Sequence, residues 1–319
     1  KKKSITAVTF NPYKVGTKSL TSSLLSEDAV EYVQPNYLYE PNDISDDPYN
    51  QLLWGLNNTG QTVNGQSGIL DVDLNVPEAW EAVAGSELNE VVVAVIDTGI
   101  DINHPDLQEK IWINEEEVNG LPGADDDGNG YVDDIHGWDF FHNDNTVYDA
   151  DDGDEHGTHV AGTIAASGNN NIGIAGIAPN VKIMPLKFLG PDGGSTLDAI
   201  KAIEYAKQKG VKISNNSWGG YGGSDNDVLA AAIQNSDMLF VAAAGNEANN
   251  NDQVPAYPAS YNKSNIVSVA AIDNRGKLAS FSNYGQTTVD TAAPGVDIAS
   301  TMPGNSYGYM DGTSMASPH

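Results

Sequence analysis

Five apolar runs of strand length recur along the chain, and they limit the possible fold more than any other feature. The runs are Val91–Ile96, Val181–Phe188, Val211–Asn215, Met238–Ala244 and Ile266–Ala271. Helices are predicted between them at Thr196–Gln208 and Asp227–Gln234, with Ser195 as the N-cap of the first. Because strands alternate with helices, the pattern predicts an α/β fold with a mostly parallel central sheet and helices on both faces.

Two polar residues follow these runs directly. Asp97 comes after Val91–Ile96, and Asn246 comes after Phe240–Gly245. In open parallel sheets, ligand chemistry gathers at the carboxyl ends of the strands. We therefore expect an active site at that edge of the sheet.

A serine near the end of the sequence has the surroundings of a nucleophile. Within Asp311–His319 (DGTSMASPH), the flexible Gly312 lies two residues before Ser314, and small, helix-compatible residues follow. This pattern fits a serine at the start of a helix, where backbone N–H groups can stabilise an oxyanion. A separate segment, HGTHVAG, begins at His156. The chain order Asp97, His156, Ser314 is the order found in subtilisin and differs from that in chymotrypsin and the α/β-hydrolases.

Together with Phe240–Glu247, these segments make four blocks in order, through which the chain resembles a subtilisin-like serine endopeptidase of the subtilase family. The resemblance covers nearly the whole chain. It implies a subtilisin-like three-layer αβα fold and a catalytic domain at residues 42–319. A serine alone is a poor nucleophile and needs a base. The resemblance assigns the catalytic roles: nucleophile Ser314, general base His156, its orienting partner Asp97, and oxyanion-hole donor Asn246.

The resemblance also implies protein or peptide substrates that bind in extended form between two edges of the enzyme. The residues expected to form these edges and to line the S1 pocket are Gly193, Gly194, Ser195, Ser217, Trp218, Gly219, Ala243, Ala244 and Gly245, with Ala256 near the base of the pocket. Trp218 stands where the family usually carries a smaller aliphatic residue, which predicts a narrower rim. Glu247 would favour a basic P1 residue if it points inward.

An acidic loop between Asp97 and His156 predicts a structural calcium site. Within Asp125–Asp134, alternate residues fit D-x-[DN]-x-[DN]-G, the first half of an EF-hand loop, and Gly130 permits the sharp turn. The expected ligands are Asp125, Asp127, Asn129, the Tyr131 carbonyl and Asp133, with Asp134 as an alternative to the last. The twelfth position is His136 instead of the usual Glu. A solvated acidic turn without a cation is the alternative.

A second calcium site follows from the resemblance alone. Its expected ligands are the side chains of Asp47, Asp106 and Asn170 and the carbonyls of Ile172 and Ile174. The loop 169–174 is one residue longer than the common form, so the choice among Asn169, Asn170 and Asn171 stays open.

Composition narrows the range of partners. The net charge of −29 and the pI near 4.1 argue against nucleic acid and an anionic membrane as partners, because both carry the same sign of charge. No cysteine is present, so neither a disulfide nor thiol chemistry is available. A secreted monomer is expected from the resemblance.

The N-terminal residues 1–41 resemble the C-terminal part of an inhibitory and chaperone propeptide, a small α+β unit. Strands are predicted at Ser4–Phe10 and Ala29–Val33, a helix at Thr17–Glu27, and a cleavable linker at Tyr39–Asp47. The implied enzyme is a zymogen whose own propeptide inhibits it. An unrelated N-terminal hairpin is the alternative. Both ends of the sequence look cut, which predicts a fragment of low stability and weak activity.

Two other functions are alternatives to that of a serine protease. One is a non-catalytic subtilase-fold module that binds protein or calcium, which a complete triad disfavours. Another is an acid-type relative, in which Glu replaces the base and Asp replaces the oxyanion residue; His156 and Asn246 disfavour it. His159 lies three residues after His156 without the H-E-x-x-H pattern, so we expect a packed histidine there, not a zinc ligand.

Overall fold

The computed structural model describes residues 17–27, 29–30, 32–33 and 45–319, and the chain divides into two compact units, Lys1–Asn42 and Asp43–His319. In the first unit, α1 spans Thr17–Leu25, where a helix was predicted. The predicted strand Ser4–Phe10 lies outside the described residues, as does most of the predicted linker Tyr39–Asp47. Residues 29, 30, 32 and 33 of the strand predicted at Ala29–Val33 are not in a strand. The propeptide assignment stays a prediction.

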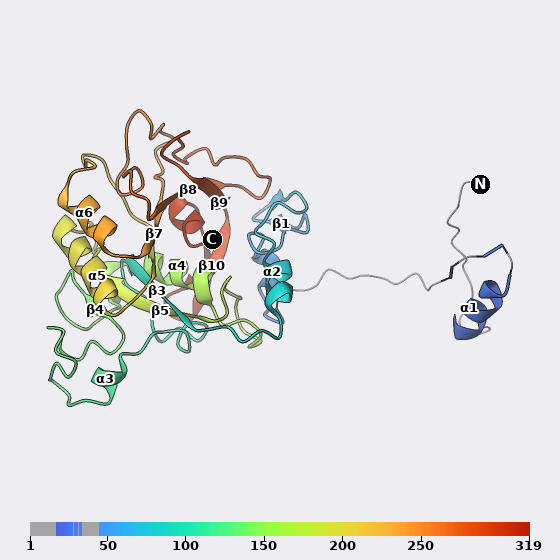
Figure 1. Cartoon of the computed structure of the whole chain (residues 1–319), viewed down its shortest axis with the longest axis horizontal. Helices are drawn as coiled ribbons and strands as arrows, with labels where there is room; N and C mark the ends of the chain where they lie inside the picture. Colours follow the sequence, from blue (N-terminus) through green and yellow to red (C-terminus); the bar gives the residue numbers. More distant parts are fainter. Residues whose placement is uncertain (1–16, 28, 31, 34–44) are drawn as a thin grey trace. The chain divides into compact units, whose positions relative to one another are not determined.

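The second unit is built on a seven-stranded parallel sheet with the order β4-β5-β3-β6-β7-β8-β9 (Figure 1). Its strands are β3 (Val91–Asp97), β4 (Trp138–Asp139), β5 (Val181–Lys187), β6 (Ile213–Asn216), β7 (Leu239–Ala243), β8 (Ile266–Ile272) and β9 (Thr291–Pro294). The five predicted strands are β3, β5, β6, β7 and β8, so the predicted parallel α/β sheet is confirmed.

Helices and two short antiparallel pairs complete the unit. The helices are α2 (Val76–Val83), α3 (Glu115–Val118), α4 (Glu155–Ala165), α5 (Thr196–Gln208), α6 (Val228–Asn235) and α7 (Thr313–Ala316), with 3₁₀ turns η1 (Asn50–Leu52) and η2 (Ala150–Asp152). The pairs are β1 (Thr62–Val63) with β2 (Gln66–Ser67) and β10 (Ile298–Met302) with β11 (Ser306–Met310). Among the described residues, no helix has the length and apolar character needed to cross a membrane.

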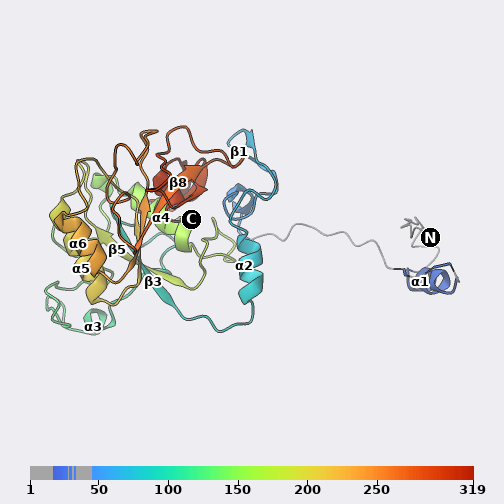
Figure 2. The same cartoon turned by 45° about the horizontal axis from the view of Figure 1, so that its top comes forward.

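Side chains of β3 alternate between the two faces of the sheet, and each face is covered by helices, which gives three layers. Ala94 and Ile96 pack in the core beneath α5 and α6, which lie side by side in both views (Figures 1 and 2). Val93 and Val95 point to the opposite face and pack in the core that contains α4. Successive side chains of a strand alternate between faces, so a strand that is apolar throughout needs helices on both sides.

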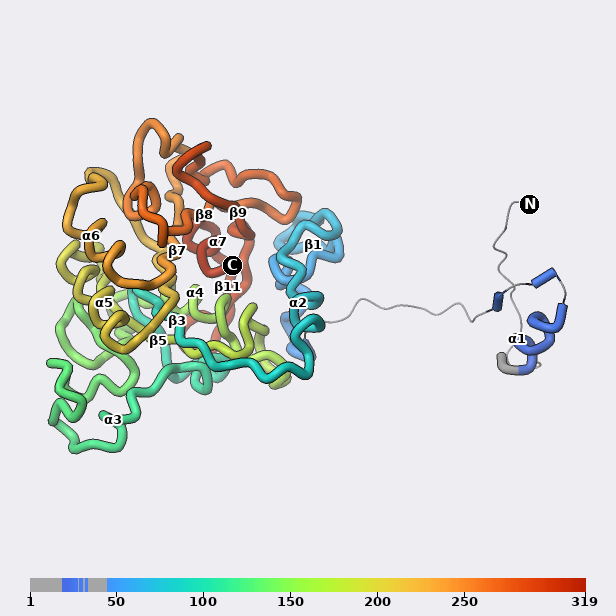
Figure 3. Tube along the Cα trace, viewed as in Figure 1, coloured from blue at the N-terminus to red at the C-terminus, as the bar shows by residue number. Residues whose placement is uncertain are grey.

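The carboxyl edge of the sheet is where the candidate catalytic segments meet. Asp97 is the last residue of β3, Ser217 follows β6, and Asn246 lies just beyond β7. The helix α7 packs against β7, β8 and β9, and Figure 3 shows this red end of the chain beside β8 and β9. Strands from distant parts of the sequence thus carry the site residues to one edge.

Candidate active site

Asp97 and His156 form a hydrogen-bonded pair. His156 Nδ1 lies 2.7 Å from Asp97 Oδ1, which also accepts a hydrogen bond from Thr98 N at 2.7 Å. The Asp97 carboxylate is fully buried, whereas 29% of the His156 side chain is exposed. With its proton on Nδ1 facing the carboxylate, the neutral ring leaves Nε2 as an acceptor toward solvent.

The electrostatics of this pair favour the imidazolium. Burial disfavours the charged ring, but the Asp97 charge and hydrogen bond outweigh burial and raise the pKa of His156 above its ordinary value. A base with this orientation can accept a proton at Nε2 and be stabilised in its protonated form.

Ser314 lies in the first turn of α7 and is tied to the end of β6. Ser314 Oγ donates to the Ser217 carbonyl at 3.1 Å, and Ser217 Oγ donates to the Ser314 carbonyl at 2.8 Å. Among the described residues, no hydrogen bond joins Ser314 Oγ to the His156 ring. Catalytic hydrogen bonds are often long or misaligned before substrate binds, so this geometry leaves the predicted roles open.

Asn246 is held by its side-chain oxygen. Its Oδ1 accepts hydrogen bonds from Thr313 N at 2.8 Å and from Thr313 Oγ1 at 2.9 Å. The residue is exposed, and its Nδ2 has no acceptor among the described residues. An ideal Cβ on Gly312 would lie 3.7 Å from that Nδ2, which places Gly312 beside the amide. The structure therefore presents a free amide donor next to the residue that precedes Ser314.

The first predicted substrate edge, Gly193–Ser195, is an exposed turn before α5. Backbone hydrogen bonds of 3.1 and 3.0 Å between Gly190 and Gly193 close the turn. Ser195 Oγ accepts a hydrogen bond from Asp198 N at 3.1 Å and caps α5, as predicted. Because these residues are exposed, an extended peptide can approach their backbone.

The second predicted edge, Ser217–Gly219, continues from β6. Trp218 is half-buried and packs edge-on against Phe188, with ring centroids 4.9 Å apart, and against Phe240. Its indole Nε1 is buried and has no hydrogen-bond partner among the described residues. The large side chain thus packs against the core beneath this edge, and the narrower rim stays a prediction.

Three of the residues expected to line S1 lie at the end of β7 and directly after it. Ala243 and Ala244 are buried, whereas Gly245 is half-buried with φ = +110° and donates its N–H to Thr313 Oγ1 at 3.1 Å. The expected base residue Ala256 is also buried. These small side chains bring the chain from β7 close to α7, the helix that contains Ser314.

Glu247 is fixed at this wall by two side chains that the sequence analysis did not identify, those of Tyr221 and Asn283. Its Oε2 accepts hydrogen bonds from Tyr221 Oη at 2.8 Å, from the Asn246 backbone N–H at 2.9 Å and from Asn283 Nδ2 at 3.2 Å. The carboxylate is therefore bound by neutral donors, with no lysine or arginine partner in the described part of the chain.

Sequence comparisons identify the family of this chain. A model of the subtilase family matches residues 89–319. The chain is 40% identical over 315 residues to a thermophilic serine proteinase of Bacillus sp. (strain AK1), covering 97% of this chain and 66% of that protein. It is 39% identical over 250 residues to thermitase of Thermoactinomyces vulgaris, covering 77% of this chain and 76% of thermitase.

The chain belongs to the subtilase family. This confirms the resemblance to subtilisin-like serine endopeptidases and places the chain in that enzyme class. The chain spans just under two thirds of the Bacillus relative, so the activity of the whole protein is treated below as a proposal.

Solved structures agree with the family. The structure of a protease from Pseudoalteromonas arctica is similar, with a TM-score of 0.65 and 31% identity, over 86% of this chain and 84% of that one. A cold-adapted subtilisin-like serine proteinase gives a TM-score of 0.58 and 30% identity, over 84% and 81%. The subtilisin-like three-layer fold expected from the sequence is thereby confirmed.

The acidic loop of this subtilase gathers three carboxylates, only one of which was among the predicted ligands. Glu117, Asp127 and Asp134 offer oxygen atoms that lie within 4.8 Å of one another, and Glu117 and Asp134 are buried. Asp134 was expected only as an alternative ligand. The Lys209 ammonium bonds Asp127 and lies 3.5 Å from Asp134 Oδ2. Glu117 comes from α3, outside the loop, so the EF-hand spacing gave no signal for it.

The other predicted ligands of this loop have different partners. Asp125 accepts the backbone N–H groups of Asn129 and Gly130 at 3.0 and 2.8 Å, as in a tight acidic turn. Asp133 accepts the Gly123 N–H at 2.8 Å. Asn129 Nδ2 donates to Asp134 Oδ2 at 2.7 Å, and the Tyr131 ring packs on Trp138, Phe140 and Tyr205. The donor set is rich in oxygen and suits Ca²⁺, although Lys209 already supplies one positive charge.

The second predicted calcium site brings its side chains together. Asn170 Nδ2 donates to Asp106 Oδ1 at 2.8 Å, and Asp47 accepts the backbone N–H of Asn170 at 3.0 Å. Asp47 and Asp106 are both buried, and no basic side chain of the described residues forms an ion pair with either. Ile172 N donates to Asn170 Oδ1 at 2.9 Å, and Ile174 N donates to Asp106 Oδ2 at 3.1 Å. Two buried carboxylates that no basic side chain pairs with fit the calcium ion that the sequence resemblance implies.

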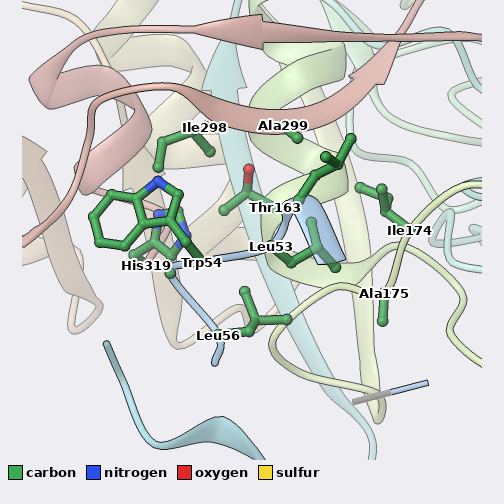
Figure 4. Close-up of a pocket in the computed structure, with 11 residues that line it drawn as sticks. Leu53, Trp54, Leu56, Thr163, Ile174, Ala175, Ile298, Ala299 and His319 are labelled. Carbon is green, nitrogen blue, oxygen red and sulfur yellow. The ribbon is translucent and has the colours of Figure 1, made fainter. Parts of the chain in front are cut away.

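An apolar pocket lies apart from the candidate catalytic residues, none of which lines it (Figure 4). The residues labelled in Figure 4 that line it are Leu53, Trp54, Leu56, Thr163, Ile174, Ala175, Ile298, Ala299 and His319. Trp54 Nε1 donates to the Val296 carbonyl at 3.0 Å, so the indole is already satisfied. The pocket offers no cluster of reactive groups.

His159 is a packed histidine of α4, as expected. It is fully buried, and its Nε2 lies 2.9 Å from the Ile298 carbonyl, which fixes the proton on that nitrogen. Burial lowers the pKa of His159 to about 4. The unfolded chain therefore takes up a proton at this residue at a higher pH than the folded protein does.

We predict that His159 makes the protein less stable as the pH falls from about 6.5 to 4, because only the unfolded state is then protonated there. Between pH 7 and pH 5 this contribution amounts to about 2 kcal/mol of the free energy of unfolding. Urea unfolding of wild type and His159→Gln at both pH values measures it, since glutamine can still donate to the Ile298 carbonyl. An equal loss in both proteins would contradict the prediction.

Proposed function

We propose that this protein is a serine endopeptidase that hydrolyses peptide bonds in proteins through an acyl-enzyme. The observation that carries the proposal is the 2.7 Å hydrogen bond between His156 Nδ1 and the buried Asp97 carboxylate. Ser314 lies at the same edge of the sheet, where its Oγ donates to the Ser217 carbonyl. Membership of the subtilase family supports the same conclusion.

In the proposed reaction, Ser314 Oγ attacks the carbonyl carbon of the scissile bond while His156 Nε2 takes the hydroxyl proton. Asp97 holds the ring and stabilises the imidazolium without taking the proton. His156 then gives the proton to the leaving amine as the C–N bond breaks. A water molecule, deprotonated by His156, hydrolyses the ester and restores the Ser314 hydroxyl.

Asn246 would donate its free Nδ2–H to the oxyanion beside the Ser314 backbone N–H. Its Oδ1 contacts with Thr313 hold the amide before substrate arrives, so the donor needs no rearrangement when charge develops. Preorganised donors of this kind stabilise the transition state more than the substrate.

Protein substrates would lie extended between Gly193–Ser195 and Ser217–Gly219, with the P1 side chain near Ala243–Gly245. The Glu247 carboxylate, which Tyr221 holds, would favour a basic P1 residue if it points toward that side chain. We further propose a secreted monomer made as a zymogen, with residues 1–41 as part of its own inhibitory propeptide. The acidic net charge of −29 supports the expectation that neither nucleic acid nor an anionic membrane is a partner.

Calcium would stabilise the fold without entering the reaction. Asp47, Asp106 and Asn170, with the carbonyls of Ile172 and Ile174, would hold one ion. The acidic loop would hold another through Asp127, Asp134 and Glu117, where cation binding must compete with Lys209. The non-catalytic binding module remains the alternative function, and the Asp97–His156 pair disfavours it because mere binding does not require an oriented base.

A fluorophosphonate probe tests the proposed function. We expect the full-length gene product to be labelled at Ser314, as read by peptide mass spectrometry, because only an activated serine reacts at a useful rate. Ser314→Ala should lose the label and the hydrolysis of casein, and Ser317→Ala serves as a serine control that should retain both. A folded, processed wild type that is neither labelled nor proteolytic would establish the binding-module alternative.

For Asn246→Ala we expect kcat to fall by roughly 10²–10³-fold, a magnitude measured for the corresponding change in subtilisin itself, with KM nearly unchanged. The donor acts on the oxyanion, which exists only in the transition state. Steady-state kinetics on a peptide anilide measure both constants. A large rise in KM at wild-type kcat would mean that Asn246 binds the ground state instead.

Removal of calcium should lower the melting temperature, because an ion that binds only the folded protein stabilises it by about 3 kcal/mol at 100 times its Kd. The measurement is thermal unfolding in EDTA and in excess Ca²⁺. Asp106→Asn should lose much of the difference between the two conditions, whereas Glu78→Gln, an exposed acid of α2, should keep it. Coincident wild-type curves would exclude both calcium sites.

A further inference from the structure

A lysine with no exposed side-chain surface lies beside the candidate dyad. Lys187 is the last residue of β5 and pairs in register with Asp97 of β3. Its ammonium bonds the Thr98 carbonyl, Asp154 Oδ1 at 2.6 Å and the Leu189 carbonyl at 3.1 Å. These three acceptors match the three N–H donors of a lysine, so the buried charge is fully hydrogen-bonded.

Further carboxylates complete the surroundings of this ammonium. Asp152 Oδ2 lies 3.1 Å from Lys187 Nζ and 3.6 Å from His142 Nδ1. His142 itself pairs with the buried Asp139 at 2.8 Å. A lysine buried without partners would be very costly, so this arrangement persists only because the acidic groups surround it.

The acceptors of Lys187 adjoin both members of the dyad. Thr98 follows Asp97 directly, and Asp154 is the N-cap residue of α4, two positions before His156. Thr98 Oγ1 also accepts the Gly157 N–H at 3.1 Å. We call Lys187, Thr98 and Asp154 the clamp, since they join the end of β3 to the start of α4.

Two glycines allow these backbones to come into contact. A Cβ on Gly157 would lie 2.3 Å from the Gly99 carbonyl oxygen, and a Cβ on Gly99 would lie 2.4 Å from Asp154 Oδ2. Real Cβ atoms essentially never come so close. The start of α4 therefore rests directly on the segment after Asp97, and the clamp spans this contact.

We infer that Lys187 is a positioning residue that sets the distance and angle between Asp97 and His156, an inference that rests on the proposed protease function. Lys187 touches neither substrate nor a reacting atom. Its ammonium binds both the Thr98 carbonyl and the Asp154 carboxylate. The end of β3 and the start of α4 therefore cannot move independently. A shift of about 1 Å in such a constellation can cost 10²-fold in rate.

Asp154→Asn tests the clamp with a near-isosteric change that leaves Asp152, 3.1 Å from Lys187 Nζ, to compensate the ammonium. Burial raises the pKa of Asp154 to about 6, so the wild type itself carries a neutral side chain here in mildly acidic solution. The substitution weakens the link from Lys187 to α4 and leaves the link to Thr98. We expect kcat to fall by roughly tenfold or more, with KM within about threefold, because orientation in the transition state is lost and the substrate edges are intact.

A spectroscopic readout separates positioning from general destabilisation. The downfield NMR resonance of the His156 Nδ1 proton reports its hydrogen bond to Asp97 and should shift or broaden in Asp154→Asn. Lys110→Met is the matched control: it removes a half-buried ammonium that bonds the Pro179 carbonyl at 2.6 Å, away from the dyad. It should leave both kcat and the resonance unchanged.

Combining Lys187→Met with Asp154→Asn removes both charges, so neither is left buried alone, and should deepen the loss in kcat. If this double variant does not fold, Asp154→Asn decides by itself. Wild-type kcat and an unmoved resonance in folded Asp154→Asn would overturn the inference. The resonance is measurable even in a protein that hydrolyses nothing, so a clamp that fails is distinguishable from a proposed function that fails.

Discussion

The hydrogen bond between Asp97 and His156 is the interaction on which the rest of the site depends. A buried carboxylate at the end of a strand is costly unless donors meet it, and here the Thr98 N–H and the His156 ring do so at Oδ1. Asp97 Oδ2 has no partner among the described residues. The negative charge is therefore left incompletely compensated, and a proton on His156 is the change that compensates it.

Small residues place the helix that carries His156. A Cβ on Gly162 would lie 2.2 Å from Thr301 Oγ1 and 2.5 Å from Ser300 Oγ, so α4 can approach β10 only with glycine at this position. Ser300 Oγ then donates to the His159 carbonyl at 2.6 Å, and Thr301 Oγ1 donates to the Thr158 carbonyl at 2.8 Å. The HGTHVAG segment thus combines one reactive ring with the glycines that its close packing requires.

The parts of the fold that could be predicted from the sequence are those in which one periodicity dominates. β3, β5 and β8 are long apolar runs, and α5 carries its own capping serine. The sequence analysis did not identify β4 or β10. β4 is only two residues long, too short to show a pattern. β10 carries Ser300 and Thr301, whose hydroxyls donate to backbone carbonyls of α4 instead of facing an apolar core. Their existence follows from tertiary contacts that no local pattern contains.

Site residues were missed for the same reason. Glu117 meets the acidic loop from a separate helix, and Lys187 at the end of an apolar run looks like an exposed strand terminus until β4 and α4 cover it.

The distribution of buried charge ranks the two proposed calcium sites. Asp127 and Asp134 already have the Lys209 ammonium, which also lies over the Tyr205 ring, 5.4 Å from its centroid. Asp47 and Asp106 have only N–H and O–H donors, including Tyr307 Oη at 2.8 Å from Asp106. Neutral donors reduce the cost of burying a carboxylate but cannot cancel its charge. A cation is therefore needed more at Asp47 and Asp106, where an ion would gain the full attraction of two buried charges without displacing a lysine.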